Sequence, residues 1–179
     1  MTEKEIIQGC IKKNHVCQRL LFEKFAGKML SLCQRYSKDQ QEAKDITQEG
    51  FIRVFDFIHQ FKFEGSFEGW LRRIFVNVAT RHASKRKISF TDIDIVETDT
   101  TTIDASVVSK LSEDEIHKFI SRMPEGYRLV FNLNVVEGYS HEEIGTLLGI
   151  QPSTSRTQLT KARRMLQSLI LKNFNAVVL

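Results

Sequence analysis

Residues 139–156 read YSHEEIGTLLGIQPSTSR, and this stretch decides the fold of the C-terminal part of the chain. Ser140 and Glu143 have the spacing of a capping box, which predicts that a short helix begins here. Gly149 then supplies a turn, and Pro152 suits the first position of a second helix, where its missing N–H costs nothing. These features together predict a helix–turn–helix, the unit that lays one helix across the DNA backbone and places the next in the major groove.

The second helix of this pattern has one apolar face and one polar face. Leu159, Ala162, Leu166 and Leu169 repeat at helical spacing and are expected to face inward. The residues left toward solvent or DNA are Ser153, Thr154, Arg156, Thr157, Lys161 and Arg164. Short hydroxyl side chains can donate to phosphates, and an arginine can reach O6 and N7 of guanine. The alternative interpretation is an ordinary packing turn between helices.

The distribution of charge favours a nucleic-acid partner. The chain of 179 residues has a net charge of only +4, but six Lys or Arg and no acidic residue lie in 71–90. Five Lys or Arg and again no acidic residue lie in 144–179, whereas 91–115 contains eight acidic residues and one lysine. Two basic segments on either side of an acidic one indicate two contacts with a polyanion.

Composition excludes several other classes. With 41% hydrophobic and 27% charged residues and only two prolines, the chain fits a helix-rich protein with one ordinary core or two small ones. No apolar run approaches about 18 residues and the N-terminus lacks a signal-peptide core, so we expect no membrane insertion and a cytoplasmic location. Cys10, Cys17 and Cys33 are expected to be buried reduced thiols rather than a disulfide or zinc site. No metal, cofactor or catalytic group is predicted.

The predicted fold is all-α, with two small helical domains. Residues 1–88 form the first domain, 89–111 a flexible acidic linker, and 112–179 the second domain with the helix–turn–helix. In the first domain the two glycines of 64–69 predict a loop, so the fourth helix is expected to begin near Trp70.

A second cluster of interest lies at 61–82, where aromatic residues adjoin the glycine-containing loop and a basic helix. Aromatic rings in such a place can stack on unpaired bases while Lys and Arg hold the backbone. The alternative is that the rings belong to the core, which we expect for most of them. Phe63 and Phe67 are the rings for which the core interpretation is weakest.

At these residues the sequence resembles a known family. The segments DITQEGFIRVF (45–55) and FEGWLRRIFVN (67–77), followed by the helix–turn–helix at 139–164, are similar to bacterial sigma factors of the extracytoplasmic-function (ECF) group. The resemblance covers nearly the whole chain apart from the linker. It implies a protein that joins RNA polymerase core, recognises the −10 and −35 promoter elements and promotes DNA melting, without covalent chemistry.

The resemblance also implies roles for individual residues. Those expected to dock on the clamp helices of the largest polymerase subunit are Asp45, Gln48, Glu49 and Arg53. Those expected at the −10 element, where the loop 64–69 would capture a flipped base, are Lys62, Ser66, Phe67, Arg73, Asn77 and Arg81. Those expected at the −35 element are Ser153, Thr154, Arg156, Thr157, Lys161 and Arg164. The flap of the second-largest subunit and an anti-sigma factor are further candidate partners.

Three positions depart from the family pattern. Ser153 and Ser155 stand where the family usually has glycine and an apolar residue, and Gln158 stands where a basic residue is common. These departures concern the preferred −35 sequence and not the fold.

Two other function classes compete with this interpretation. A stand-alone helix–turn–helix regulator with a sensing N-terminal domain would share the C-terminal motif, but the segment 45–55 argues against it. An enzyme is more distant, because GxxxxGKS/T, HExxH and GxSxG are absent and the five histidines are scattered.

Overall fold

The computed structural model describes residues 1–86, 88–90 and 111–177, apart from the side chains of residues 113 and 174–177. Every regular element in these ranges is a helix, which confirms the all-α prediction for them. The chain divides into two compact units, Met1–Arg86 and Lys87–Leu179, and each is described here by itself. Most of the predicted linker, 91–110, lies outside the described residues.

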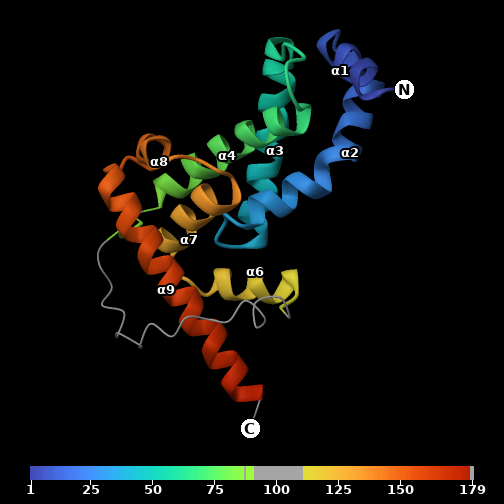
Figure 1. The fold of residues 1–179 in the computed structure, drawn as a ribbon. Coiled ribbons are helices and arrows are strands. Elements are labelled where there is room, and N and C mark those ends of the chain that lie inside the picture. The colour runs from blue at the N-terminus through green and yellow to red at the C-terminus, as the bar shows by residue number, and fades with distance from the viewer. Residues whose placement is uncertain (87, 91–110, 178–179) are drawn as a thin grey trace. The chain divides into compact units, whose positions relative to one another are not determined.

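Unit 1 contains four α-helices and one 3₁₀ turn (Figure 1). These are α1 (Glu3–Ile11), α2 (His15–Gln34), α3 (Gln40–Phe57), η1 (Ile58–Gln60) and α4 (Phe67–Lys85). Local hydrogen bonds set the beginnings of the helices: Thr2 and Glu5 form a capping box at α1, and the Asp39 carboxylate accepts from the Glu42 N–H at α3.

The core of unit 1 lies where α2, α3 and α4 meet. Leu21 and Met29 of α2, Ile46 of α3 and Phe75 of α4 are fully buried there. Gly50 permits this approach, because a Cβ at that position would lie 2.3 Å from a ring atom of Phe75. A side chain at position 50 would therefore force α3 and α4 apart.

The beginning of α4 differs from the prediction. The helix begins at Phe67, about one turn before the expected Trp70, because the Ser66 hydroxyl accepts a hydrogen bond from the Gly69 N–H at 3.3 Å. The glycine at position 69 lies in the first helical turn and does not interrupt it. The predicted loop 64–69 is therefore wrong from Phe67 onward, and residues 67–69 are helical.

Unit 2 begins its regular structure with α6 (Glu113–Ser121) and α7 (Glu125–Phe131), which continues into a π-helical turn, η2 (Asn132–Val136). The helices α8 (His141–Leu148) and α9 (Pro152–Val177) follow (Figure 1). Both capping boxes predicted in this unit are present, Ser112 with Glu115 and Ser140 with Glu143. The core contains Tyr127 and Leu129 of α7, Ile144 of α8 and Ala162 of α9.

The three cysteines are buried and free, as predicted. Burial raises the pKa of Cys10 and of Cys33 to about 11. Both therefore stay protonated and unreactive as nucleophiles at neutral pH.

Candidate nucleic-acid and protein interfaces

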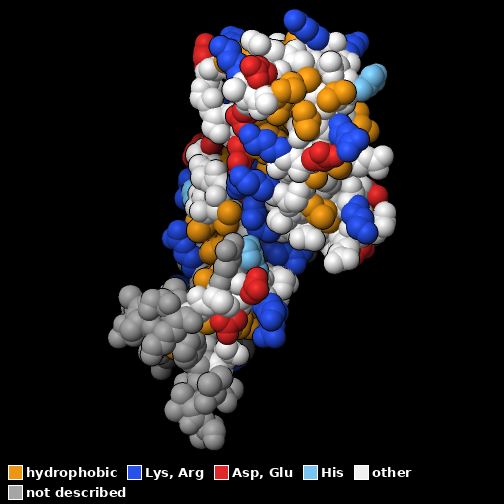
Figure 2. Space-filling model, turned by 90° about the vertical axis from the view of Figure 1, so that its right-hand side faces the viewer, with side chains coloured by type: hydrophobic (Ala, Val, Ile, Leu, Met, Phe, Trp, Pro, Cys, Tyr) orange, Lys and Arg blue, Asp and Glu red, His pale blue; other side chains and the backbone are white. Residues whose placement is uncertain are grey.

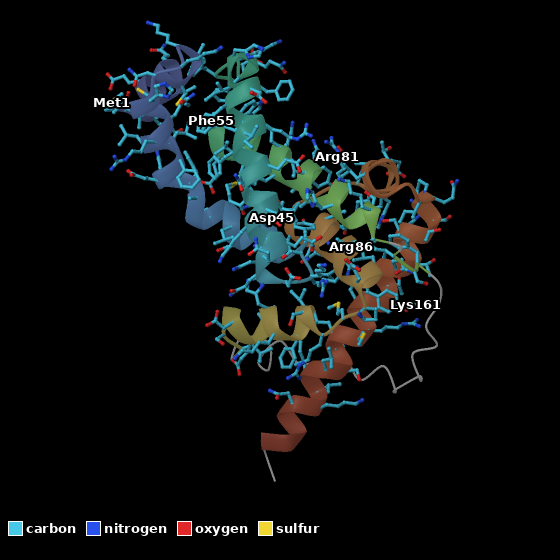
Figure 3. The ribbon with its side chains drawn as sticks, turned by 180° about the vertical axis from the view of Figure 1, so that it is seen from behind. Met1, Asp45, Phe55, Arg81, Arg86 and Lys161 are labelled. Carbon is cyan, nitrogen blue, oxygen red and sulfur yellow. The ribbon has the colours of Figure 1, made fainter. Side chains whose placement is uncertain are left out.

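The outer face of α3 carries exposed polar side chains. Asp45 and Gln48 are both exposed, and the Gln41 amide donates a hydrogen bond to an Asp45 carboxylate oxygen at 3.0 Å. Ile46, the residue after Asp45, is fully buried instead (Figure 3 labels Asp45). The helix thus presents Asp45 and Gln48 outward, as expected from the sequence.

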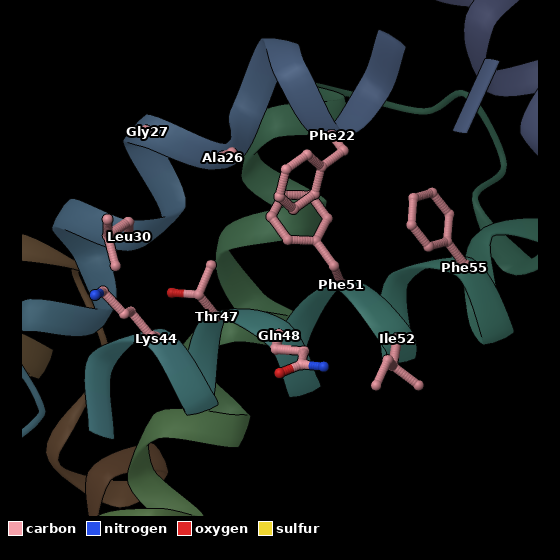
Figure 4. Close-up of a pocket in the computed structure, with 10 residues that line it drawn as sticks. All are labelled: Phe22, Ala26, Gly27, Leu30, Lys44, Thr47, Gln48, Phe51, Ile52 and Phe55. Atoms are coloured by element: carbon pink, nitrogen blue, oxygen red, sulfur yellow. The ribbon is translucent and has the colours of Figure 1, made fainter. Parts of the chain in front are cut away.

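An apolar groove of about 530 Å³ lies beside this polar face, between α2 and α3. Figure 4 shows the rings of Phe22 and Phe51 side by side in its wall, with centroids 4.7 Å apart. Ile52, on its rim, is 54% exposed, and Phe22 is 44% exposed. The full lining is Phe22, Ala26, Gly27, Leu30, Lys44, Thr47, Gln48, Phe51, Ile52 and Phe55.

The groove was not predicted from the sequence. The sequence did contain an indication of it. Phe22 and Ile52 are large apolar residues that fall outside the buried faces of their helices. Figure 2 shows hydrophobic side chains open to solvent among charged ones on the face that carries α1 and α2. An exposed apolar groove with polar residues at its rim is typical of a protein-binding surface.

Glu49 and Arg53, also predicted to contact a partner, form ion pairs and hydrogen bonds within unit 1. Both side chains are half-buried, and an Arg53 guanidinium nitrogen lies 3.0 Å from a Glu49 carboxylate oxygen. His82 Nε2 of α4 lies 2.7 Å from the other oxygen, and Arg81 lies 4.0 Å from the first. The hydrogen bond from His82, followed by that from Arg53, holds the pKa of Glu49 below its usual value. Glu49 thus links α3 to α4.

Replacing Glu49 with glutamine should lower the thermal stability of unit 1 at neutral pH. A lowered pKa in the folded state stabilises the fold above the usual glutamate pKa of 4.5, and this contribution is lost as the pH falls through the lower folded value. The difference in melting temperature between wild type and Glu49→Gln should therefore shrink on acidification. Thermal unfolding at several pH values measures it, with the exposed Asp56→Asn as control; a difference independent of pH would contradict the role of the ionised carboxylate.

The exposed face of α4 and the preceding loop carry most of the residues predicted for the −10 element. Arg73, Asn77 and Arg81 are exposed at four-residue intervals and therefore share one face of the helix (Figure 3 labels Arg81). Lys62 and Ser66 are exposed in the loop before it. The predicted −10 residues other than Phe67 are therefore all exposed, three along one face of α4 and two in the loop before it.

Phe67 does not belong to this surface. It is 2% exposed, and its ring contacts those of Phe25, Phe61 and Trp70 at centroid distances of 5.8, 5.0 and 5.6 Å. The edge-on and stacked geometries of these contacts occupy the ring on several sides. The prediction that Phe67 contacts DNA is corrected accordingly: its side chain is part of the core, because helix α4 begins early enough to turn it inward.

The helix–turn–helix of unit 2 has the predicted geometry. Gly149 ends α8 in the left-handed conformation, with a φ of 68°, which would strain a residue that has a side chain. Gly145 permits the tight turn, since a Cβ there would lie 2.8 Å from the Ile150 carbonyl oxygen. Helix α9 begins at Pro152, as predicted.

The first turns of α9 present the predicted DNA-facing residues. Ser153, Arg156, Thr157 and Arg164 are exposed, and Thr154 and Lys161 are half-buried. An Arg156 guanidinium nitrogen lies 3.4 Å from a carboxylate oxygen of Glu142 on α8, and both side chains are largely open to solvent. Such a pair is weak and can exchange for a phosphate or a base.

Two of the departures from the family pattern face the interior of unit 2. Ser155 is fully buried, and its hydroxyl lies 2.9 Å from Nδ1 of His141 on α8. Gln158 is 1% exposed, and its amide donates to the Phe90 carbonyl oxygen at 2.9 Å. Ser155 therefore links α9 to α8, and Gln158 links α9 to the segment at Phe90. Of the three residues that differ from the family pattern, Ser153 is the one that faces solvent.

No group of three or more His, Cys, Asp or Glu side chains among the described residues is arranged to hold a metal ion. Within the same residues, no helix is both long and apolar enough to span a bilayer.

Comparison with known proteins identifies both units. Residues 21–88 match sigma-70 region 2, and residues 113–166 match sigma-70 region 4. The RNA polymerase sigma-H factor of Pseudomonas aeruginosa is 30% identical over 163 residues, which cover 84% of this chain and 84% of that protein. The ECF RNA polymerase sigma factor SigW of Bacillus subtilis is 30% identical over 155 residues, covering 80% and 83%. The chain belongs to the ECF sigma factors.

This sigma factor is thus a transcription initiation factor and not a member of an enzyme family. The match to region 2 removes the alternative of a stand-alone helix–turn–helix regulator. Its fold is also similar to a solved structure of the sigma factor RpoE with the anti-sigma factor NepR from Bartonella quintana. The TM-score is 0.51 at 19% identity, covering 86% of this chain and 96% of that one. A structure of CnrH with the cytosolic domain of CnrY gives a TM-score of 0.51 at 16% identity, covering 94% and 96%.

Proposed function

We propose that this sigma factor binds RNA polymerase core through unit 1, reads the −10 element with unit 1 and the −35 element with unit 2, and promotes melting of the promoter. The observation that carries this proposal is the match of unit 1 to sigma-70 region 2 and of unit 2 to sigma-70 region 4. Region 2 presents an apolar and acidic surface on α3, suited to a protein partner, and a basic surface on α4, suited to DNA. Region 4 presents a basic surface on α9. Such a protein would act in the cytoplasm, where the polymerase and the chromosome are.

The polymerase contact is assigned to the groove between α2 and α3 together with Asp45 and Gln48. A helix of the polymerase clamp laid along the groove would bury the exposed side chains of Ile52 and Phe22. Asp45 and Gln48 at the rim would set its register with charge and hydrogen bonds. Glu49 and Arg53 contribute by holding α3 against α4.

A second polymerase contact, with the flap of the second-largest subunit, is assigned to the end of α7. Val135 and Val136 are 47% and 40% exposed there, in the π-helical turn that precedes the helix–turn–helix. Turns of this kind often lie at functional sites. An anti-sigma factor, such as the one bound to RpoE in its solved structure, is a further proposed partner and would compete for these same surfaces.

Transcription in vitro with core polymerase across a library of promoters tests the whole proposal. We expect transcripts that depend on the sigma factor and that start downstream of promoters sharing two sequence elements. Core polymerase with no sigma factor is the control. Transcription that is equal with and without this protein on every promoter would contradict the proposal.

Arg156 and Lys161 should have different effects at the −35 element. If Arg156 reads a base edge, Arg156→Ala should cost about 1–3 kcal/mol on the preferred sequence and relax the preference at one position. If Lys161 neutralises a phosphate, Lys161→Ala should weaken binding to all sequences alike and reduce the salt slope by about one unit.

Affinities of the holoenzyme for single-base variants of the −35 element, measured at several salt concentrations, separate the two roles. The control is Lys172→Ala, which removes an exposed charge from the same helix about 24 Å from Arg156 at 1.5 Å per residue. Equal and sequence-independent losses from the Arg156 and Lys161 variants would assign Arg156 to the phosphates.

A further inference from the structure

The first residues of the predicted linker are held on unit 2. The Phe90 carbonyl oxygen accepts a hydrogen bond of 2.9 Å from the side-chain amide of Gln158 on α9. Gly126 of α7 lets this segment approach closely, since a Cβ there would lie 3.1 Å from the Ser89 carbonyl oxygen and 3.2 Å from a ring carbon of Phe90. We call this contact of residues 88–90 with Gly126 and Gln158 the clasp.

The side chain of Gln158 is committed to the clasp. It is 1% exposed, and a buried amide donor needs an acceptor, which the Phe90 carbonyl provides. The amide oxygen of Gln158, in contrast, has no hydrogen-bond donor among the described residues. Because Gln158 stands where the family commonly has a basic residue, the clasp is a feature of this chain.

The chain is fixed to unit 1 only four residues before Phe90. Arg86, the C-cap of α4, donates a hydrogen bond to the Tyr36 carbonyl oxygen at 2.8 Å and forms an ion pair with Glu42 of α3 (Figure 3 labels Arg86). With the clasp closed, the tether that joins the two units is therefore the chain from Arg86 to Phe90. Its contour length is at most about 14 Å.

A tether of this length is too short for the protein to read both promoter elements. Asn77 lies nine residues before Arg86, about 14 Å along α4 at 1.5 Å per residue, and Arg156 lies within one turn of Gln158 on α9. Together with the closed tether, these lengths allow a reach of about 45 Å between Asn77 and Arg156. Positions −10 and −35 are about 25 base pairs apart, or about 85 Å of straight duplex at about 3.4 Å per base pair.

Opening the clasp removes this limit. The tether then extends from Arg86 to Ser112, the N-cap of α6, and its contour length rises to about 90 Å. The same chain thus has two tether lengths, and the contact between Phe90 and Gln158 selects between them.

We propose that the clasp is closed in the free sigma factor and must be open in the holoenzyme that binds both promoter elements. The second half of this inference rests on the proposed function, which supplies the two DNA contacts. The first half concerns the free protein and does not depend on it. Because only the open state can bind both elements, the clasp lowers the apparent affinity by the fraction of molecules that are open.

Energy transfer between one fluorophore on each unit tests the state of the tether. Asp56 and Ser121 are exposed and can be replaced by cysteine for labelling, because Cys10, Cys17 and Cys33 are buried. Gln158→Met removes the amide donor at similar side-chain length, and it also removes the unpaired amide oxygen, so unit 2 should unfold at the same temperature as in wild type. In the free protein this variant should lower the transfer efficiency, because the tether lengthens.

The matched control is Gln167→Met, the same change at an exposed glutamine of α9, which should leave the transfer efficiency as in wild type. Wild type bound with core polymerase to a promoter with both elements should show the low efficiency of the open tether. At a fixed concentration of core polymerase, half-maximal occupancy of this promoter should need about 5-fold less Gln158→Met than wild type, the equivalent of one net hydrogen bond that no longer has to break.

Equal transfer efficiency in free wild type and free Gln158→Met would overturn the clasp. High efficiency that persists in the wild-type promoter complex would overturn its opening. A wild-type holoenzyme that binds neither promoter element would instead overturn the proposed function, and the result for the free protein would stand.

Discussion

Replacing Ile52 with glutamate should weaken binding to RNA polymerase core by about 30-fold or more, the effect of losing one interface residue worth about 2 kcal/mol. Ile52 is 54% exposed on the rim of the groove between α2 and α3, so its replacement leaves the core of unit 1 untouched. A carboxylate at this position would lose water on docking without gaining a partner. Charge reversal at the neighbouring Asp45, as in Asp45→Lys, should also weaken binding.

Titration of labelled sigma factor with core polymerase measures this effect, and circular dichroism establishes that the helices persist. The matched control is Phe57→Glu, which places the same charge at another exposed apolar residue of α3 that does not line the groove. If Phe57→Glu and Ile52→Glu weakened binding equally, the loss would reflect charge on α3 in general. The polymerase would then have to dock elsewhere.

Replacing Phe67 with alanine should destabilise unit 1 by about 3–5 kcal/mol, the usual cost of emptying the volume of a buried aromatic ring. The ring lies between Phe25 of α2, Phe61 and Trp70, so its loss leaves a cavity where three segments meet. Ser66→Ala should cost less, about 1 kcal/mol, through loss of the hydroxyl that caps α4.

Urea unfolding followed by tryptophan fluorescence measures both effects, because Trp70 is the single tryptophan of the chain and lies in unit 1. The control is Phe57→Ala, at a ring that is 42% exposed. A Phe67→Ala protein as stable as wild type would mean that the ring is not packed as described. A Phe67→Ala variant therefore tests the stability of unit 1.

The local features of this fold could be predicted from the sequence because they depend on residues a few positions apart. The capping boxes of Thr2, Ser112 and Ser140 each join a hydroxyl to a backbone N–H three residues later. The turn at Gly149 likewise depends on one backbone conformation and on the proline that follows. The order of the three family-like segments was also sufficient to assign the family.

The tertiary structure alone decided which side chains are available to partners. Glu49 and His82 are 33 residues apart in sequence, and only the packing of α4 on α3 brings their side chains together. The α2–α3 groove likewise exists because two helices leave Phe22 and Ile52 uncovered. Phe63 and Phe67 have the same chemistry and lie four residues apart, yet one is exposed and the other buried. The physical reason is that burial depends on neighbours distant in sequence, which local spacing does not specify.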